Sequence, residues 1–173
     1  MKKNLILLII AISTVNCNST SNPDLDGIEH LICEDYWAAI NLSAFCDMNL
    51  GNFDLTGFND SCHGDSNDSY THDELIYIRV YNGFEESEAR EDYNVDKEFH
   101  QSVDGYMERS DIGDEAFAIL DIEFGKLDGL YLSVRKGKYT IILEVNGNSA
   151  NDSNNCFTPD TVFDFAKALV APL

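Results

Sequence analysis

The sequence has few basic residues. It contains 11 Lys and Arg against 31 Asp and Glu, which gives a formal net charge of -20. Because phosphate recognition needs clustered positive charge, this composition excludes a nucleic-acid-binding surface of the usual kind. The chain is not short of hydrophobic residues (44%) or aromatic residues (11%), so it can bury a core, and wholesale disorder is excluded. Its 173 residues fit one domain of ordinary size.

Long hydrophobic runs are also scarce. One unbroken apolar run, Leu5–Ile12, follows Lys2 and Lys3 near the start of the chain. A membrane-spanning helix needs about 20 apolar residues, so this run is too short to cross a membrane. It has the length and the basic flank of the apolar region of a secretory signal. The sequence therefore predicts a signal peptide over residues 1–16 and no transmembrane segment.

A cysteine follows the apolar run. The segment Thr14-Val15-Asn16-Cys17 resembles the lipobox of bacterial lipoproteins, although Thr14 and Asn16 differ from the residues usual there. The resemblance implies that Cys17 is the lipid attachment site and that residues 17–24 form a polar tether. It also implies a cell-envelope location. Because the strong negative charge repels anionic headgroups, we expect membrane contact through the lipid anchor only. The alternative is simple secretion, with Cys17 an ordinary thiol.

The remaining cysteines are Cys33, Cys46, Cys62 and Cys156. An even number in an exported protein predicts two disulfide bonds. Three pairings are possible. We favour Cys46–Cys62, which closes the shorter loop across an irregular segment, with Cys33–Cys156 joining the two ends. The sequence has no C-x-x-C pair, so a zinc knuckle is disfavoured.

Hydrophobic periodicity predicts an α+β fold in a single domain over residues 25–173. Apolar residues at helical spacing predict helices within 24–42, within 84–103 and from 158 to the end of the chain. Alternating or β-branched segments predict strands near 57–63 and at 75–81, 106–108, 116–123, 129–135 and 139–146. We expect an antiparallel sheet, with a β-meander in the second half and the helices packed on one face.

A short motif carries a second resemblance. Ile112-Gly113-Asp114-Glu115-Ala116-Phe117 is similar to the [LI]-G-D-x-A-[FY] turn of a group of bacterial cell-envelope lipoproteins of unassigned function. The resemblance implies a sensor-like α+β domain and an envelope location, and it brings no catalytic residues. The residue types themselves predict a structural role, because Gly113 permits a positive φ and Asp114 can accept backbone N–H groups.

The segment 63–74 carries the candidate metal ligands. Imidazoles suit zinc and carboxylates suit calcium. The candidates are His63, Asp65, Asp68, His72 and Asp73. An EF-hand loop counted from Asp65 fails, because Tyr70 stands where glycine is needed and Ile76 where the bidentate glutamate belongs. The alternative is a solvated loop of an acidic protein.

Motifs for catalysis are missing. There is no G-x-S-x-G segment and no glycine-rich phosphate loop, and Cys62 and His63 are strand neighbours that point to opposite faces. We therefore predict no catalytic residue and no cofactor. The favoured function is a non-enzymatic binding or interaction module for an unknown protein or small-molecule partner. The alternatives are a secreted metal-dependent hydrolase that uses the 63–74 loop, and a soluble secreted or periplasmic inhibitor.

Overall fold

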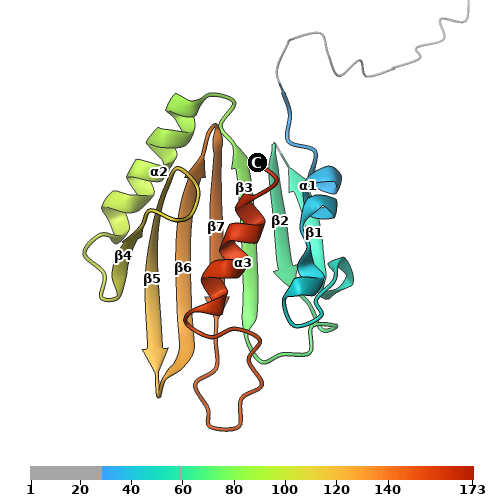
Figure 1. Ribbon diagram of the computed structural model, residues 1–173. Helices are drawn as coiled ribbons and strands as arrows, with labels where there is room; N and C mark the ends of the chain where they lie inside the picture. Colours follow the sequence, from blue (N-terminus) through green and yellow to red (C-terminus); the bar gives the residue numbers. More distant parts are fainter. Residues whose placement is uncertain (1–28, 59) are drawn as a thin grey trace, which may run out of the picture.

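The computed structural model describes residues 29–58 and 60–173 (Figure 1). The predicted signal peptide, Cys17 and the tether lie outside the described residues. Within the described residues, one antiparallel sheet of seven strands is accompanied by three α-helices. The prediction of an antiparallel α+β fold is therefore confirmed. None of the described helices has the length and apolar composition needed to cross a membrane.

The sheet consists of two meanders joined edge to edge. Its order is β1-β2-β3-β7-β6-β5-β4, so the pairing of β3 with β7 connects the two halves. The strands are β1 Phe53–Phe58, β2 Ser61–Ser66, β3 Leu75–Asn82, β4 Tyr106–Arg109, β5 Glu115–Glu123, β6 Lys126–Lys136 and β7 Tyr139–Asn146. The four strands expected in the second half are confirmed. The single strand expected near 57–63 is wrong: Asp60, at φ 58°, turns the chain between β1 and β2.

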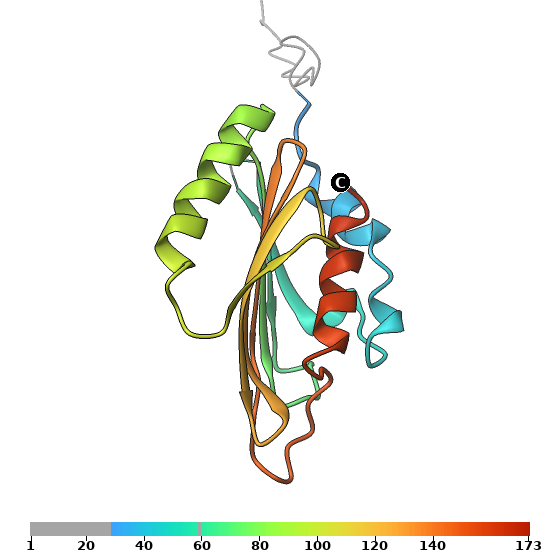
Figure 2. The same cartoon turned by 60° about the vertical axis from the view of Figure 1, so that its left-hand side comes forward.

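The helices cover both faces of the sheet (Figure 2). α1 Cys33–Ala39 and α3 Thr161–Val170 lie on one face, and α2 Glu86–His100 lies on the other. The expectation that all helices share one face thus holds only for α1 and α3. The reason is that β5 and β6 carry rings on their second face as well, where Tyr93 of α2 packs on Phe117 at 5.7 Å between ring centroids. Two short 3-10 helices, η1 Leu42–Ala44 and η2 Leu50–Asn52, follow α1.

The main core lies between the sheet and α3. Alternate residues of the central strands point into it, including Ile78 and Val80 of β3 and Leu143 of β7, each fully buried. Phe165 and Leu169 of α3 pack against them. Each of these side chains contributes about 1.5–3 kcal/mol when it is fully buried.

The helix expected from residue 158 begins three residues later, at Thr161, and Asp160 before it makes no side-chain capping hydrogen bond. The backbone N–H of Thr161 donates to Thr158 Oγ1 at 3.2 Å, and the N–H of Thr158 donates to Thr161 Oγ1 at 2.9 Å. This reciprocal pair links Thr158 to the first residue of α3 and satisfies the N–H of Thr161, one of the donors that the first turn of a helix leaves free.

The two expected disulfides are present, but the favoured pairing is wrong. The bonds join Cys33 to Cys62 and Cys46 to Cys156. α1 brings Cys33 against the β1–β2 hairpin, where a side chain at Gly57 would come within 2.9 Å of the Cys33 sulfur. Cys46 lies beyond the other end of α1, close to the segment that precedes α3. The position of α1 across the hairpin decides the pairing, and loop length does not.

The hexapeptide 112–117 has a structural role. Gly113 adopts φ 63°, and a Cβ there would lie 2.4 Å from Val134 Cγ1 and 2.7 Å from the carbonyl oxygen of Arg135. The Asp114 carboxylate accepts the backbone N–H of Gly137 at 2.8 Å, and this hydrogen bond lowers the pKa of Asp114. The motif therefore fixes the start of β5 to the β6–β7 hairpin.

Candidate functional site

The structure disperses the five candidate metal ligands. His63 and Asp65 lie on β2, Asp68 follows that strand, and His72 and Asp73 precede β3. Within residues 29–58 and 60–173, no three of the five bring their ligand atoms within 4.8 Å of one another. The strand holds the first two on the sheet, whereas Asp73 turns away and accepts the backbone N–H of Asn154 at 2.7 Å. In the described residues, therefore, these five side chains do not come together as a cluster of three ligands.

A different group of side chains gathers on one face of β1, β2 and β3. Residues paired in register point to the same side of a sheet, and alternate residues of each strand share a face. Three such rows form what we call the outer face: Phe58, Ser61 and Tyr81; Thr56, His63 and Arg79; and Asp54, Asp65 and Tyr77. The outer face lies opposite the buried Cys62, Ile78 and Val80 of the main core.

No helix of the described residues covers the outer face. Tyr81 is in register with Thr140 of β7, whose hydroxyl donates to Asp92 of α2 at 2.8 Å, so α2 lies on this same side of the sheet. α2 packs on β6 and β7, however, and leaves the side of β1 to β3 open, as Figure 2 shows. The side chains of the outer face are accordingly half-buried or exposed.

A chain of hydrogen bonds fixes the centre of the outer face. His63 lies between two hydroxyl groups, with Nδ1 3.1 Å from the Tyr77 hydroxyl and Nε2 3.0 Å from Ser61 Oγ. Ser61 Oγ donates to the carbonyl oxygen of Phe58 at 2.6 Å, so Nε2 of His63 is the donor toward Ser61. Nδ1 then accepts from Tyr77. Each of the three side chains is held in one orientation.

Arg79 has an exceptional position among the cations. Every other Lys and Arg of the described residues has a hydrogen-bond or ion-pair partner; the guanidinium of Arg135, for example, donates to Glu115 at 2.6 Å. Within the part of the chain that the structure describes, Arg79 has none. It lies half-buried in the middle row of the outer face, between Tyr77 and Tyr81 along β3. An unpaired guanidinium in so acidic a protein is an available donor for an anion.

The electrostatics of the outer face are mixed. Burial raises the pKa of the Tyr77 hydroxyl, Arg79 opposes this rise, and the carboxylates of Asp65 and Glu144 add to it. Tyr77 therefore stays protonated and remains a donor to His63 near neutral pH. Asp54 and Asp65 pair across β1 and β2 at one end of the outer face, so its negative charge is concentrated there and Arg79 supplies the positive charge at the centre.

The structure also contains an open cavity beside β1, which Thr56 of the outer face helps to line. It has a volume of about 480 Å³, lies between α1 and β1, and is lined mainly by apolar groups, including Trp37, Leu50 and Leu55. Glu34 is its one charged lining residue. None of the site residues predicted from the sequence, apart from the disulfide Cys33, lines this cavity.

The outer face cannot be recognised as a site from the sequence. Its residues come from three strands and meet only through strand pairing. A signal was present in β3, where Tyr77, Arg79 and Tyr81 alternate with Ile76, Ile78 and Val80. That alternation predicts a strand with one polar and aromatic face, but it does not show that a helix leaves the face open.

Comparisons of this chain with models of protein families, with curated proteins and with solved structures found no match.

Proposed function

We propose that this protein is an exported envelope protein, anchored by a lipid on Cys17, whose domain is a non-enzymatic binding module. The signal-like start of the chain and the two disulfide bonds are consistent with export. Membrane contact comes through the lipid alone, because a net charge of -20 repels anionic headgroups. The outer face is the binding surface.

The unpaired guanidinium of Arg79 carries this proposal. Arginine recognises carboxylate and phosphate groups with two parallel hydrogen bonds. Tyr77 and Tyr81 flank it with rings on which a flat or apolar part of a ligand can pack. The ligand class is therefore a molecule or protein segment that presents a carboxylate or phosphate to Arg79 and a ring or apolar group to the tyrosines.

The acidic end of the outer face determines the orientation of the bound ligand. Asp54 and Asp65 repel a second anionic group, so the part of the ligand that reaches them is neutral or cationic. The anionic group lies over Arg79, and the rest of the ligand extends along β2 and β3.

The hydrogen bonds of Ser61 favour binding over hydrolysis. A serine nucleophile is activated when its hydroxyl proton points to a base. Ser61 instead directs its proton to the carbonyl oxygen of Phe58, and it accepts from His63. The dispersed positions of the five predicted metal ligands likewise favour a binding role over the metal-dependent hydrolase.

Phosphate binding tests the outer face. We expect that inorganic phosphate, titrated into labelled protein, shifts the NMR signals of the Arg79 side chain and of the amides of β2 and β3. In Arg79→Gln we expect the apparent Kd to rise at least about 10-fold, because a hydrogen bond to a charged group contributes about 1.5–3 kcal/mol.

Arg90→Gln is the matched control. Arg90 is an exposed cation on α2, already paired with Glu115 at 3.5 Å, so its loss leaves the outer face intact. Its titration should follow that of the wild type. Shifts that are spread equally over other cations, or an Arg79→Gln protein that binds phosphate like the wild type, would contradict the proposal.

A further inference from the structure

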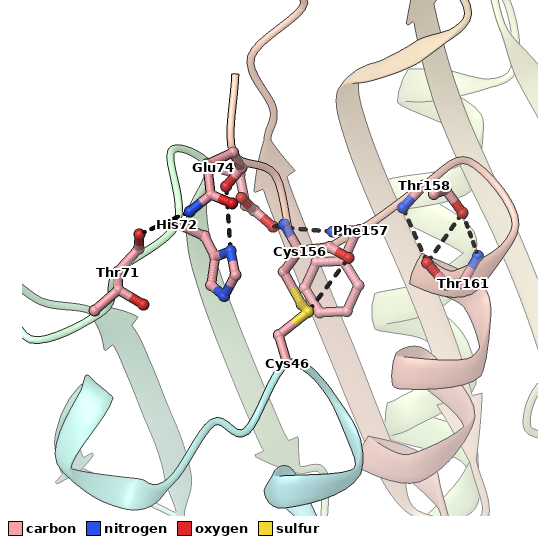
Figure 3. The surroundings of a disulfide bond; sticks show 9 residues. Cys46, Thr71, His72, Glu74, Cys156, Phe157, Thr158 and Thr161 are labelled. Atoms are coloured by element: carbon pink, nitrogen blue, oxygen red, sulfur yellow. Dashed lines mark hydrogen bonds between the residues drawn. A yellow bond between two sulfur atoms is a disulfide. The ribbon is translucent and has the colours of Figure 1, made fainter. Parts of the chain in front are cut away.

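Three ligand-type atoms meet at the end of the molecule where the segment before α3 passes η1 (Figure 3). The sulfur atoms of Cys46 and Cys156 and a ring nitrogen of His72 lie within 4.8 Å of one another. They come from three segments that are far apart in the sequence. In the oxidised protein the two sulfur atoms are bonded to each other and offer no metal a thiolate.

The imidazole of His72 is already held as a metal ligand is held. Its Nδ1 lies 3.1 Å from the carbonyl oxygen of Asn154, and because a carbonyl only accepts, Nδ1 carries the proton. The lone pair of the neutral ring is therefore on Nε2. Histidine ligands of metals characteristically donate their other N–H to a carboxylate or backbone carbonyl in this way.

The segment that carries Cys156 is fixed by contacts other than the disulfide. The Glu74 carboxylate is buried, and its Oε1 accepts the backbone N–H groups of Cys156 at 2.6 Å and Phe157 at 3.1 Å (Figure 3). Asn154 Nδ2 also donates to the carbonyl oxygen of Thr71 at 3.2 Å. These bonds tie residues 71–74 to residues 154–157 and keep His72 beside Cys156.

The segment that carries Cys46 is fixed by the ring of the preceding residue, Phe45. Phe45 packs edge-on against Phe165 of α3 at 5.2 Å, and Phe165 stacks on Phe157 at 5.0 Å. Cys46 therefore stays close to Cys156 when the bond between them is broken. The sulfur atoms need to separate only to about 3.8 Å to bind one tetrahedral zinc ion with Zn–S bonds of about 2.3 Å.

The two disulfides differ in their access to a reductant. Cys46 is exposed, whereas Cys62 of the other bond is fully buried beneath the sheet. A thiolate reaches the Cys46 sulfur from solvent, whereas the other bond offers only the half-buried Cys33 at the edge of the cavity between α1 and β1. We therefore expect the Cys46–Cys156 bond to be reduced before the Cys33–Cys62 bond.

We propose that the Cys46–Cys156 disulfide is a redox-gated zinc site, in which reduction creates a Cys2His centre made of Cys46, Cys156 and His72. A dithiol reductant supplies the electrons. Its first thiolate bonds to the Cys46 sulfur and displaces the Cys156 thiolate, and its second thiolate then displaces the Cys46 thiolate and closes the reductant's own disulfide. Two electrons pass to the protein, and the reductant's two protons go to the cysteines or to solvent. Zn²⁺ binds both thiolates and His72 Nε2, any thiol proton is released, and a water takes the fourth position.

Cobalt(II) reports thiolate ligation directly. The full chain is reduced anaerobically with one equivalent of a phosphine, and alkylation with mass spectrometry identifies the free thiols. We expect Cys46 and Cys156 to be free and Cys33–Cys62 to remain bonded. The reduced protein should bind one Co²⁺ with thiolate-to-cobalt charge-transfer absorption that Zn²⁺ abolishes, and the oxidised protein should show none.

Variants separate this centre from the other sulfur atoms. The double variant Cys46→Ser/Cys156→Ser keeps Cys17, Cys33 and Cys62 and should show no charge-transfer absorption. His72→Ala should weaken Co²⁺ binding at least about 10-fold. Loss of a residue that only hydrogen-bonds a metal ligand already lowers metal affinity about 10–100-fold. His30→Ala, which changes an exposed imidazole far from this cluster, should bind like the wild type.

Several results would overturn the proposal. These are reduction of Cys33–Cys62 before Cys46–Cys156, loss of the folded circular dichroism spectrum on selective reduction, absence of charge-transfer absorption, and unchanged Co²⁺ affinity in His72→Ala. Melting of the reduced protein gives an independent readout, because a metal that binds only the folded chain must raise its Tm.

Discussion

Replacing both Cys46 and Cys156 by alanine is expected to lower the free energy of unfolding by about 4 kcal/mol. The bond joins residues 110 positions apart, and a link of this length removes much of the conformational freedom of the unfolded chain. A domain of this size has a free energy of unfolding of about 5–15 kcal/mol, so the variant should still fold. Urea unfolding followed by circular dichroism measures the difference.

His72→Ala is the matched control for this variant. It removes the hydrogen bond to Asn154 beside the disulfide but leaves the covalent link, so it should lower the free energy of unfolding by only about 1 kcal/mol. If the double variant lost no more stability than His72→Ala, the disulfide would not constrain the unfolded chain as we argue.

Gly113→Ala is expected to lower the free energy of unfolding by about 3 kcal/mol. The backbone at φ 63° costs a residue with a Cβ about 1–2 kcal/mol, and the overpacking adds about 1–3 kcal/mol. The new methyl group would lie 2.7 Å from the carbonyl oxygen of Arg135, which is backbone of a central strand and cannot move aside cheaply. Thermal and urea unfolding measure the loss.

Gly137→Ala separates the two causes. Gly137 has φ 56° in the β6–β7 hairpin, but a Cβ there would meet no atom within 4 Å. Only the cost of the positive φ remains, so Gly137→Ala should lower the free energy of unfolding by about 1 kcal/mol. Equal losses in the two variants would show that crowding at Gly113 contributes nothing and that the hexapeptide is not packed as described.

Local pattern was sufficient for the second half of the sheet. Leu130, Leu132 and Val134 alternate in β6, and Ile141, Leu143 and Val145 alternate in β7, so both strands and their inward face could be predicted. Contacts between residues that are distant in the sequence could not be predicted in this way. The disulfide pairing depends on where α1 lies across the β1–β2 hairpin, and no spacing of cysteines contains that information.

The candidate site was beyond prediction for a related reason. His63 was identified as a chemically interesting residue, but as a metal ligand with partners in its own loop. Its actual partners, Ser61 and Tyr77, lie on its own strand and on the next, and Arg79 becomes notable only when every other described cation is found to be paired. Which cation lacks a partner is a property of the whole fold.

The proposed function requires the chain to be exported, lipidated on Cys17 and oxidised at its other cysteines. Mass spectrometry of the protein isolated from its native host, digested without reduction, detects the lipid and the disulfide bonds in one experiment. We expect an acylated peptide that begins at Cys17, together with two cross-linked peptides that join Cys33 to Cys62 and Cys46 to Cys156. An unmodified peptide that begins elsewhere would show that Cys17 does not anchor the protein, and five free thiols would show that its cysteines are not oxidised.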